Sequence, residues 1–347
     1  MKKLLIILFN TVILFIVLNA MIAITWPIYS KLKKYNHKYN ETVAKLYDLS
    51  NDDLDILSDE TYNNFSKFRF VPFVGFSETE RKGKFVNYDE DNGRKVLRPK
   101  NCKKNIYMYG GSTMFGFNVA DYQTISQHLQ NLLNEDTCVY NHGKSYYYSK
   151  QENGLFLNHI ENEKNIDIAI FLDGINELCG SYAYAKFLNS SFNLLVEKPY
   201  KMWQKTSVMF FNTLPLTQFV NIFIGKQRWT VQNNDNLIIK TCKKNNINEL
   251  FKKRIMVRDG ICSKLNIKCI TFLQPFGGVH GKQSRELIKE ANKKRLLKKY
   301  NKLKDNDGLA IDISNVFNKF EGFAYVDDVH YSPKANKIIA EKIKELL

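Results

Sequence analysis

The sequence predicts an α/β protein with a mostly parallel sheet in a three-layer sandwich, preceded by one transmembrane helix. From Asn105 onward, short apolar segments alternate with stretches of helical periodicity, which is the pattern of βαβ units. Before them, residues 4–30 contain no charged residue. With 347 residues, of which 44% are hydrophobic and 25% charged, the chain is long enough for one sizeable α/β domain and additional segments.

Residues 1–30 are interpreted as a transmembrane anchor, because their apolar run exceeds the ~20 residues that a spanning helix needs. A cleaved signal peptide is the alternative, since Lys2 and Lys3 come first, but its apolar core is usually only ~7–15 residues long. Four lysines after the run (Lys31, Lys33, Lys34 and Lys38) favour a cytoplasmic body by the charge rule. The short N-terminus and the lack of a second span favour export, and we expect an extracytoplasmic, periplasmic domain.

Residues 31–100 are expected to form a stalk followed by a small leading β element. The segment Tyr35–Glu60 is polar with scattered leucines, which suits a helical spacer. The segment Phe70–Arg98 mixes aromatic residues with glycines, which indicates short strands and turns.

Residues 101–347 are expected to form the main domain. Four strands are predicted, at Ile106–Tyr109, Val139–Tyr140, Asp167–Leu172 and Ile267–Leu273, and the third is expected to be fully buried. Helical periodicity is found in Thr124–Leu133, Ser284–Lys302 and Ala335–Leu347. Residues 181–236 are longer than a crossover needs and rich in aromatic residues, so they are interpreted as an inserted lid or cap.

Positive charge is concentrated in one region of the chain. The net charge is +16, and residues 240–304 contain 19 Lys and Arg against 4 Asp and Glu. A basic face could bind anionic lipid or an anionic glycan, although lysine-rich helices are often simply solvated. No nucleic-acid-binding motif accompanies the charge, so nucleic acid is not expected as a partner.

The cysteines bear on the compartment. The even number fits an oxidising environment, and reduced buried thiols are the alternative; the six are Cys102, Cys138, Cys179, Cys242, Cys262 and Cys269. Cys102 and Cys138 each precede one of the first two predicted strands, so they are expected at the same sheet edge, where they could pair. Without paired cysteine spacing or nearby histidines, a zinc site is not expected. No cofactor is expected.

The first chemical motif, Gly110-Gly111-Ser112, follows the first predicted strand. Glycines permit a tight turn that exposes a hydroxyl at the carboxyl edge of the sheet, where sites of open α/β folds form. A phosphate-binding loop or a plain turn is the alternative, but no Gly-x-Gly-x-x-Gly or Gly-Lys-Ser/Thr pattern is present.

Three further motifs follow at corresponding places. Gly143 comes after the second strand, Asn176 after the third, and Asp327 and His330 lie near the C-terminus. Acyl transfer by serine needs a base, a carboxylate that orients the base, and donors for the oxyanion. His330 is the predicted base and Asp327 its carboxylate, with Asp328 as a rival; either aspartate could instead cap the following helix. His128, His142, His159 and His280 are assigned no role.

These motifs together resemble the four blocks of the SGNH/GDSL hydrolase family, in the family's order. Gly110-Gly111-Ser112 resembles the first block, Gly143 the second, Gly174-x-Asn176 the third and Asp327-x-x-His330 the fourth. The resemblance implies a flavodoxin-like SGNH hydrolase sandwich, with Ser112, His330 and Asp327 catalytic. The Ser112 amide, the Gly143 amide and the Asn176 side chain would form the oxyanion hole.

Two positions depart from the family pattern: Gly111 stands where many members have Asp, and Glu177 where Asp is usual. The resemblance implies an esterase or deacylase acting on an acyl ester, such as O-acetyl, of an envelope glycan or lipid. An O-acyltransferase with the same residues and a non-catalytic glycan-binding or assembly protein are the alternatives.

Overall fold

The computed structural model describes residues 2–32, 44–62, 68–178, 214–217, 247–277, 279–283, 290–327 and 329–347. The chain divides into two compact units, Met1–His37 with Lys186–Leu237, and Lys38–Ala185 with Ile238–Leu347. In the first unit, α1 (Lys2–Leu32) is one continuous helix. Its segment Lys2–Thr25 has a mean hydropathy of 2.7 and is long and apolar enough to cross a membrane. A signal sequence would meet the same description, so α1 is an apolar N-terminal helix of either kind.

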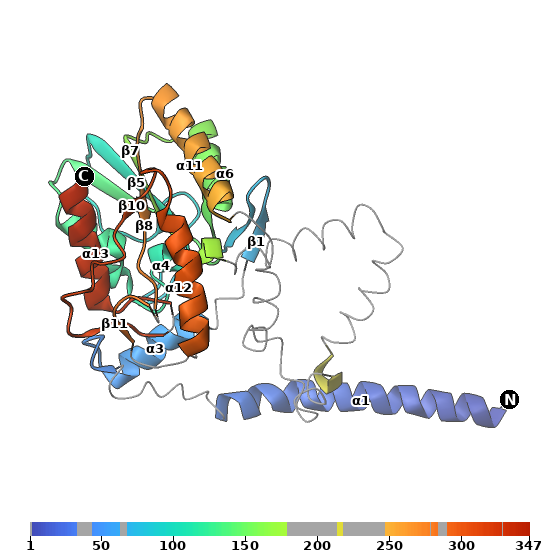
Figure 1. Ribbon diagram of the computed structural model, residues 1–347. Helices are drawn as coiled ribbons and strands as arrows, with labels where there is room; N and C mark the ends of the chain where they lie inside the picture. The colour runs from blue at the N-terminus through green and yellow to red at the C-terminus, as the bar shows by residue number, and fades with distance from the viewer. Residues whose placement is uncertain are drawn as a thin grey trace. The chain divides into compact units, whose positions relative to one another are not determined.

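The second unit is built on a seven-stranded sheet in the order β10-β8-β7-β5-β6-β4-β3. Figure 1 labels β5, β7, β8 and β10 of this sheet. Every neighbouring pair is parallel except β3 and β4. The strands are β3 (Tyr88–Asp89), β4 (Gly93–Arg94), β5 (Lys104–Gly110), β6 (Thr137–Asn141), β7 (Ile168–Asp173), β8 (Lys268–Leu273) and β10 (Ile311–Asp312).

The order of the five central strands defines where a site can form. Taken in chain order, β5, β6, β7, β8 and β10 lie in the spatial order 2-1-3-4-5, the flavodoxin-like arrangement. The predicted fold class, an α/β sandwich with a mostly parallel sheet, is therefore confirmed. In such sheets the ligand site lies outside the carboxyl ends of the strands where the order reverses, here between β5 and β7.

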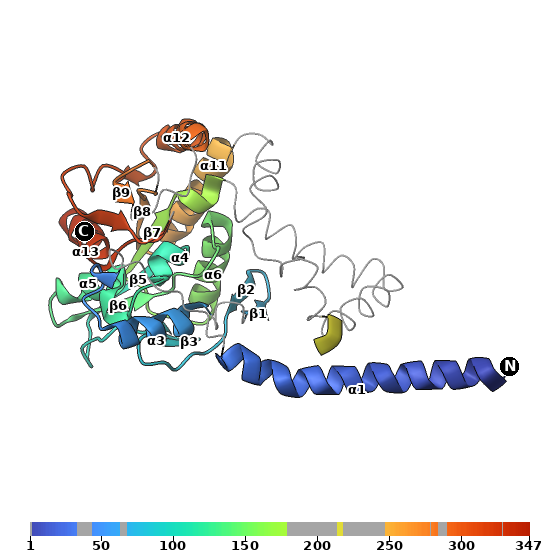
Figure 2. The same ribbon diagram turned by 90° about the horizontal axis from the view of Figure 1, so that it is seen from below.

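Helices cover both faces of the sheet. α5 (Ile125–Asn131) and α13 (Pro333–Leu346) lie on one face, whereas α6 (Ser149–Glu161) and α11 (Ile247–Lys264) lie on the other (Figures 1 and 2). Shorter or peripheral elements complete the unit: α3 (Asn51–Tyr62), β1 (Phe68–Val71), β2 (Gly75–Glu78), α4 (Ser112–Phe115), η1 (Asp121–Gln123), η2 (Ile175–Leu178), β9 (Lys282–Gln283), α12 (Glu290–Lys304) and β11 (Phe323–Tyr325).

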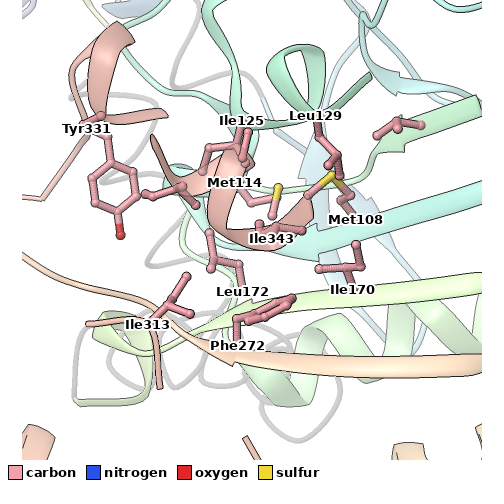
Figure 3. Close-up of a cluster of buried hydrophobic side chains, with 14 of the residues drawn as sticks. Met108, Met114, Ile125, Leu129, Ile170, Leu172, Phe272, Ile313, Tyr331 and Ile343 are labelled. Atoms are coloured by element: carbon pink, nitrogen blue, oxygen red, sulfur yellow. The ribbon is translucent and has the colours of Figure 1, made fainter. Parts of the chain in front are cut away.

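Alternation along the strands explains the two covered faces. In β5, Ile106 and Met108 point to the core shared with α5 and α13, whereas Tyr107 and Tyr109 point to the core shared with α6 and α11. Figure 3 shows the first core, in which helix and strand side chains interdigitate. The buried residues that β5, β6 and β7 contribute to the two cores are all less than a tenth exposed: Ile106, Tyr107, Met108, Tyr109, Val139, Ile168, Ala169, Ile170, Phe171 and Leu172. Burial on both faces thus produces the near-continuous apolar strands of the sequence.

The C-terminal helix begins where the sequence provides a cap. The Ser332 side chain accepts a hydrogen bond from the Ala335 amide at 3.3 Å, and Pro333 is the first helical residue. The predicted closing helix is confirmed, with its start two residues earlier than expected. This cap positions the preceding loop, which contains His330.

The expected stalk is wrong for residues 44–62, because these residues pack into the second unit. The side chains of Leu54 and Leu57 on α3 are buried in a cluster with Tyr47, Phe85, Val86, Val119, Ala120 and Val326. The Glu60 carboxylate accepts the backbone amides of Lys84, Phe85 and Val86 at 2.6, 2.9 and 2.8 Å. This segment therefore supports Val326, the residue before Asp327.

The boundary expected at residue 100 is also wrong. β3 and β4, from the predicted leading β element, lie in the main sheet, where β4 pairs with β6. Only β1 and β2 form a separate antiparallel hairpin. The expected lid at 181–236 lies outside the described residues, apart from 214–217.

The predicted pairing of Cys102 with Cys138 is confirmed, with a Cα–Cα distance of 5.6 Å. A second disulfide joins Cys262 at the end of α11 to Cys269 in β8. Cys179 and Cys242 lie outside the described residues.

Candidate active site

The site begins at the turn between β5 and α4. β5 ends at Gly110, and α4 starts at Ser112 with Gly111 as its N-cap. The sheet therefore delivers Ser112 to the carboxyl edge, beside the point where the strand order reverses. Ser112 is partly exposed, whereas its neighbours Gly111 and Thr113 are buried.

Ser112, His330 and Asp327 form a hydrogen-bonded chain. The distance from Ser112 Oγ to His330 Nε2 is 2.9 Å, and the distance from His330 Nδ1 to Asp327 Oδ2 is 2.7 Å. The serine and the histidine are 218 residues apart in the sequence, so only the sheet topology brings them together. With the imidazole proton on Nδ1, Nε2 is free to accept the serine proton, as a general base must.

Further contacts hold the carboxylate of Asp327. Its Oδ1 accepts the amides of Val329 and His330 at 2.8 and 2.7 Å, and its Oδ2 also accepts from Asn118 Nδ2 at 2.9 Å. Burial acts to raise the pKa of Asp327, but His330 and the amides of His330 and Val329 outweigh it, so the pKa is lowered. Asp327 is thus kept ionised to orient the ring. Its rival Asp328 lies outside the described residues.

Two residues of this arrangement were not predicted from the sequence. Asn118, which holds Asp327, adopts a left-handed conformation with φ of 67°. The Phe117 ring lies 4.5 Å from the His330 ring, between centroids. An asparagine after a glycine and a phenylalanine is ordinary loop composition, so no sequence signal marked either residue.

The three predicted oxyanion donors have different surroundings. The Ser112 amide lies in the first turn of α4, where amides lack helical partners. Asn176 lies in η2, directly beyond β7, and its Nδ2 donates to the Tyr147 carbonyl at 2.7 Å, which leaves the second amide hydrogen for another acceptor. The Gly143 amide already donates to Asn141 Oδ1 at 3.0 Å. It can stabilise an oxyanion only if that bond is exchanged.

Gly111 and Gly143 are both required by close packing. A Cβ on Gly111 would lie 2.3 Å from Asn176 Nδ2, and one on Gly143 would lie 2.3 Å from the Phe115 amide nitrogen. The departure at Gly111 from the family pattern therefore has a physical consequence, because it provides the space that the Asn176 amide occupies.

A cluster of charged side chains lies behind Asn176. Arg258 Nη2 is 2.6 Å from Asp173 Oδ2, and Arg254 Nη1 is 3.0 Å from Glu177 Oε2. Burial and the charge of Asp173 raise the pKa of Glu152 well above its usual range. The cluster contains three carboxyl groups and two guanidinium groups, so a protonated Glu152 balances the charges once Glu177 is ionised, at a pH above about 7. Glu177, the other departure from the family pattern, thereby ties η2 to α11.

Glu177 predicts a pH-dependent contribution to stability. Burial, followed by the charge of Asp173, raises its pKa from 4.5 to about 7. A raised pKa means that the folded state binds the proton more tightly, so this contribution is complete below pH 4.5 and is lost as the pH rises through about 7. We therefore expect the difference in unfolding free energy, wild type minus Glu177→Gln, to fall as the pH rises from 4.5 to about 7. Urea unfolding at several pH values measures this difference.

The matched control is Glu321→Gln at an exposed position, which is expected to leave the pH profile of the unfolding free energy unchanged. A wild-type-minus-Glu177→Gln difference that stays constant or rises with pH would contradict the prediction.

The other histidines within the described residues show no comparable arrangement. Burial lowers the pKa of His142 well below its usual range, that of His159 to about 3 and that of His280 to about 4. His159 Nδ1 is hydrogen-bonded to the Tyr109 hydroxyl at 2.9 Å. The rings of His142 and His159 are neutral parts of the interior, and that of His280 is neutral and half-buried. Within the described ranges, no group of His, Cys, Asp or Glu is arranged to hold a metal ion.

The fold and the site together define a class: an α/β protein with a Ser-His-Asp arrangement at the carboxyl edge of a parallel sheet. No protein-family model matches the sequence, and no curated protein matches it. Among solved structures, the chain is similar to the acetyl xylan esterase AlAXEase, with 13% identity and a TM-score of 0.38 over 70% of this chain and 99% of that one.

Two other similar structures are a member of the lipolytic protein G-D-S-L family from Veillonella parvula DSM 2008 and the native M. smegmatis aryl esterase. The first has 9% identity and a TM-score of 0.40, covering 70% of this chain and 98% of that chain. The second has 14% identity and a TM-score of 0.37, covering 70% of this chain and 100% of that chain.

Proposed function

We propose that this chain is a membrane-anchored serine esterase that removes acyl groups, O-acetyl in particular, from a cell-envelope glycan or lipid. The observation that carries the proposal is the hydrogen-bonded chain from Ser112 Oγ through His330 to Asp327, at 2.9 and 2.7 Å. A non-catalytic binding protein would have no use for a serine held to a histidine in this way at the carboxyl edge of the sheet.

The proposed reaction follows from these contacts. Ser112 Oγ attacks the ester carbonyl carbon while its proton passes to His330 Nε2, and Asp327 stabilises the protonated ring. The oxyanion accepts hydrogen bonds from the Ser112 amide and Asn176 Nδ2. The bond to the leaving alcohol then breaks, and that oxygen takes the proton from Nε2. Water attacks the acyl-serine with His330 as base, releasing the acid and restoring Ser112.

The same intermediate would serve an O-acyltransferase, in which a sugar hydroxyl replaces water. The experiment is to incubate the full-length chain in detergent with p-nitrophenyl acetate, and with an acetylated glycan plus an unacetylated acceptor. Release of acetate, dependent on Ser112, is the result expected of an esterase. Acetyl transfer to the acceptor without release would establish the transferase, and no reaction with any ester would overturn the proposal.

The proposed extracytoplasmic location is supported by the Cys102–Cys138 disulfide, because disulfides persist mainly in oxidising compartments. The apolar segment Lys2–Thr25 supports attachment to a membrane. Both points fit an enzyme of the cell envelope.

The proposed substrate is anionic, because the basic helix α12 lies next to η2, which contains the proposed oxyanion donor Asn176. α12 packs its Tyr300 and Leu303 side chains into a buried cluster with Ile175 and Leu178 of η2. Its opposite side exposes Lys294, Lys298 and Lys302, spaced one helical turn apart. This row of positive charge extends about 12 Å along the helix, which suits several acidic groups of a polymer or a lipid surface.

Charge reversal tests this part of the proposal. We expect the triple variant Lys294→Glu, Lys298→Glu and Lys302→Glu to raise KM for an acetylated acidic glycan at least about 10-fold, since opposite charges attract the substrate only in the wild type. KM for neutral p-nitrophenyl acetate should not change. High salt should remove most of the difference.

The matched control reverses the charge of Lys100, Lys103 and Lys104, which are equally exposed but lie at the amino end of β5, away from the site. Equal effects of both triple variants would mean that net charge alone matters, and the α12 surface would lose its assignment.

A further inference from the structure

The side chain of Gln274, the residue after β8, contacts the loops that contain the site. The residue is 1% exposed. Its backbone amide extends the β8–β7 pairing by donating to the Asp173 carbonyl at 2.8 Å. Its Oε1 accepts a hydrogen bond from Thr113 Oγ1 at 2.7 Å and lies 3.0 Å from the Tyr331 hydroxyl, whose single proton it shares with the Pro275 carbonyl. One buried oxygen atom therefore binds two hydroxyl groups from distant parts of the chain.

The two hydroxyl groups belong to the immediate neighbours of the proposed nucleophile and base. Thr113 follows Ser112 on α4, and Tyr331 follows His330 before the cap of α13. Tyr331 is fully buried and its hydroxyl also contacts the Pro275 carbonyl. The distance between the two loops, and hence between Ser112 Oγ and His330 Nε2, is thus linked to one glutamine.

The same side chain also lies close to Gly174, the residue between β7 and η2. A Cβ on Gly174 would lie 3.0 Å from Gln274 Cγ, and Gly174 has φ of 149°. Gly174 precedes η2, which contains Asn176. Gln274 therefore links three segments of the site: the chain after β5, the chain after β7 and the loop before α13. It touches none of the reacting atoms.

We propose that Gln274 is a positioning residue for the proposed reaction, on which this inference rests: its Oε1 holds the Thr113 and Tyr331 hydroxyls and thereby sets the Ser112–His330 distance. Catalysis depends steeply on such distances, because a displacement of about 1 Å can lower a rate about 10²-fold. Loss of the oxygen also leaves the buried Thr113 hydroxyl without its acceptor, which favours a shift of α4.

The test compares Gln274→Leu with Gln274→Glu in the full-length chain. A fluorophosphonate probe that labels reactive serines measures both the fraction of active sites and the labelling rate of Ser112, and p-nitrophenyl acetate gives kcat per labelled site. We expect Gln274→Leu to lower the labelling rate and kcat per site at least about 10-fold with KM unchanged. Gln274→Glu retains an accepting oxygen and is expected to stay within about threefold of wild type.

The matched control is Gln130→Leu, a buried glutamine that binds the Val139 amide and the Thr137 carbonyl away from the site. It is expected to lower stability but not kcat per labelled site. An unchanged labelling rate per active site in Gln274→Leu, with only a smaller active fraction, would show a structural role and overturn the proposal. If the wild type labels with the probe but hydrolyses no ester, the esterase proposal fails, whereas the labelling rates still decide the role of Gln274.

Discussion

Ser112→Ala is expected to lower kcat on an acyl ester by about 10⁴-fold or more, since removal of a triad nucleophile leaves only oxyanion stabilisation and binding. His330→Ala is expected to have a similar effect, and the double variant should be no worse than either, because the two residues act as a unit. Turnover of p-nitrophenyl acetate and labelling by a fluorophosphonate measure both effects.

The control for this prediction is Ser263→Ala, an exposed serine on α11, which should retain full activity. Thermal unfolding of Ser112→Ala should match the wild type within a few degrees, because the lost side chain is partly exposed. Near-normal turnover by Ser112→Ala would remove the assignment of this serine as nucleophile.

Gly111→Ala is expected to lower kcat by about 10²–10³-fold, the loss typical of one oxyanion donor. The added Cβ would lie 2.3 Å from Asn176 Nδ2, so the amide must move away from the position in which it faces the Ser112 turn. Asn176→Ala should produce a loss of the same size. Combining both changes should add little, since the first already displaces the group that the second removes.

Gly260→Ala is the matched control, because a Cβ at this helical position meets no atom within 4 Å. It should leave kcat unchanged and raise the free energy of unfolding by about 0.5–1 kcal/mol, since alanine favours the helix. Full activity of Gly111→Ala would mean that Asn176 is not a donor in its present position, and the oxyanion assignment would need revision.

The sequence alone determined those features that depend on local pattern and on strand direction. Apolar runs marked the central strands, and helical periodicity marked the C-terminal helix α13, although the structure starts it at Pro333, two residues before the expected Ala335. Because parallel strands end at one edge of a sheet, residues after the strands could be placed near each other. Ser112, Gly143 and Asn176 were placed in this way. The need of a serine nucleophile for a base and an orienting carboxylate pointed to His330 and Asp327, and the family resemblance implied the same residues.

Only the tertiary structure decided how these residues are held. Gln274 meets Thr113 across 161 residues, and Asn118 meets Asp327 across 209. Such contacts leave no periodicity in the sequence, because each requires one side chain in one rotamer and not a repeating face. Leu54 and Leu57, interpreted as part of a stalk, are buried inside the second unit, because leucines three residues apart on a helix fit a spacer in sequence as well as a packed helix. Burial, finally, raises the pKa of Glu177, a property that a glutamate acquires only from the groups folded around it.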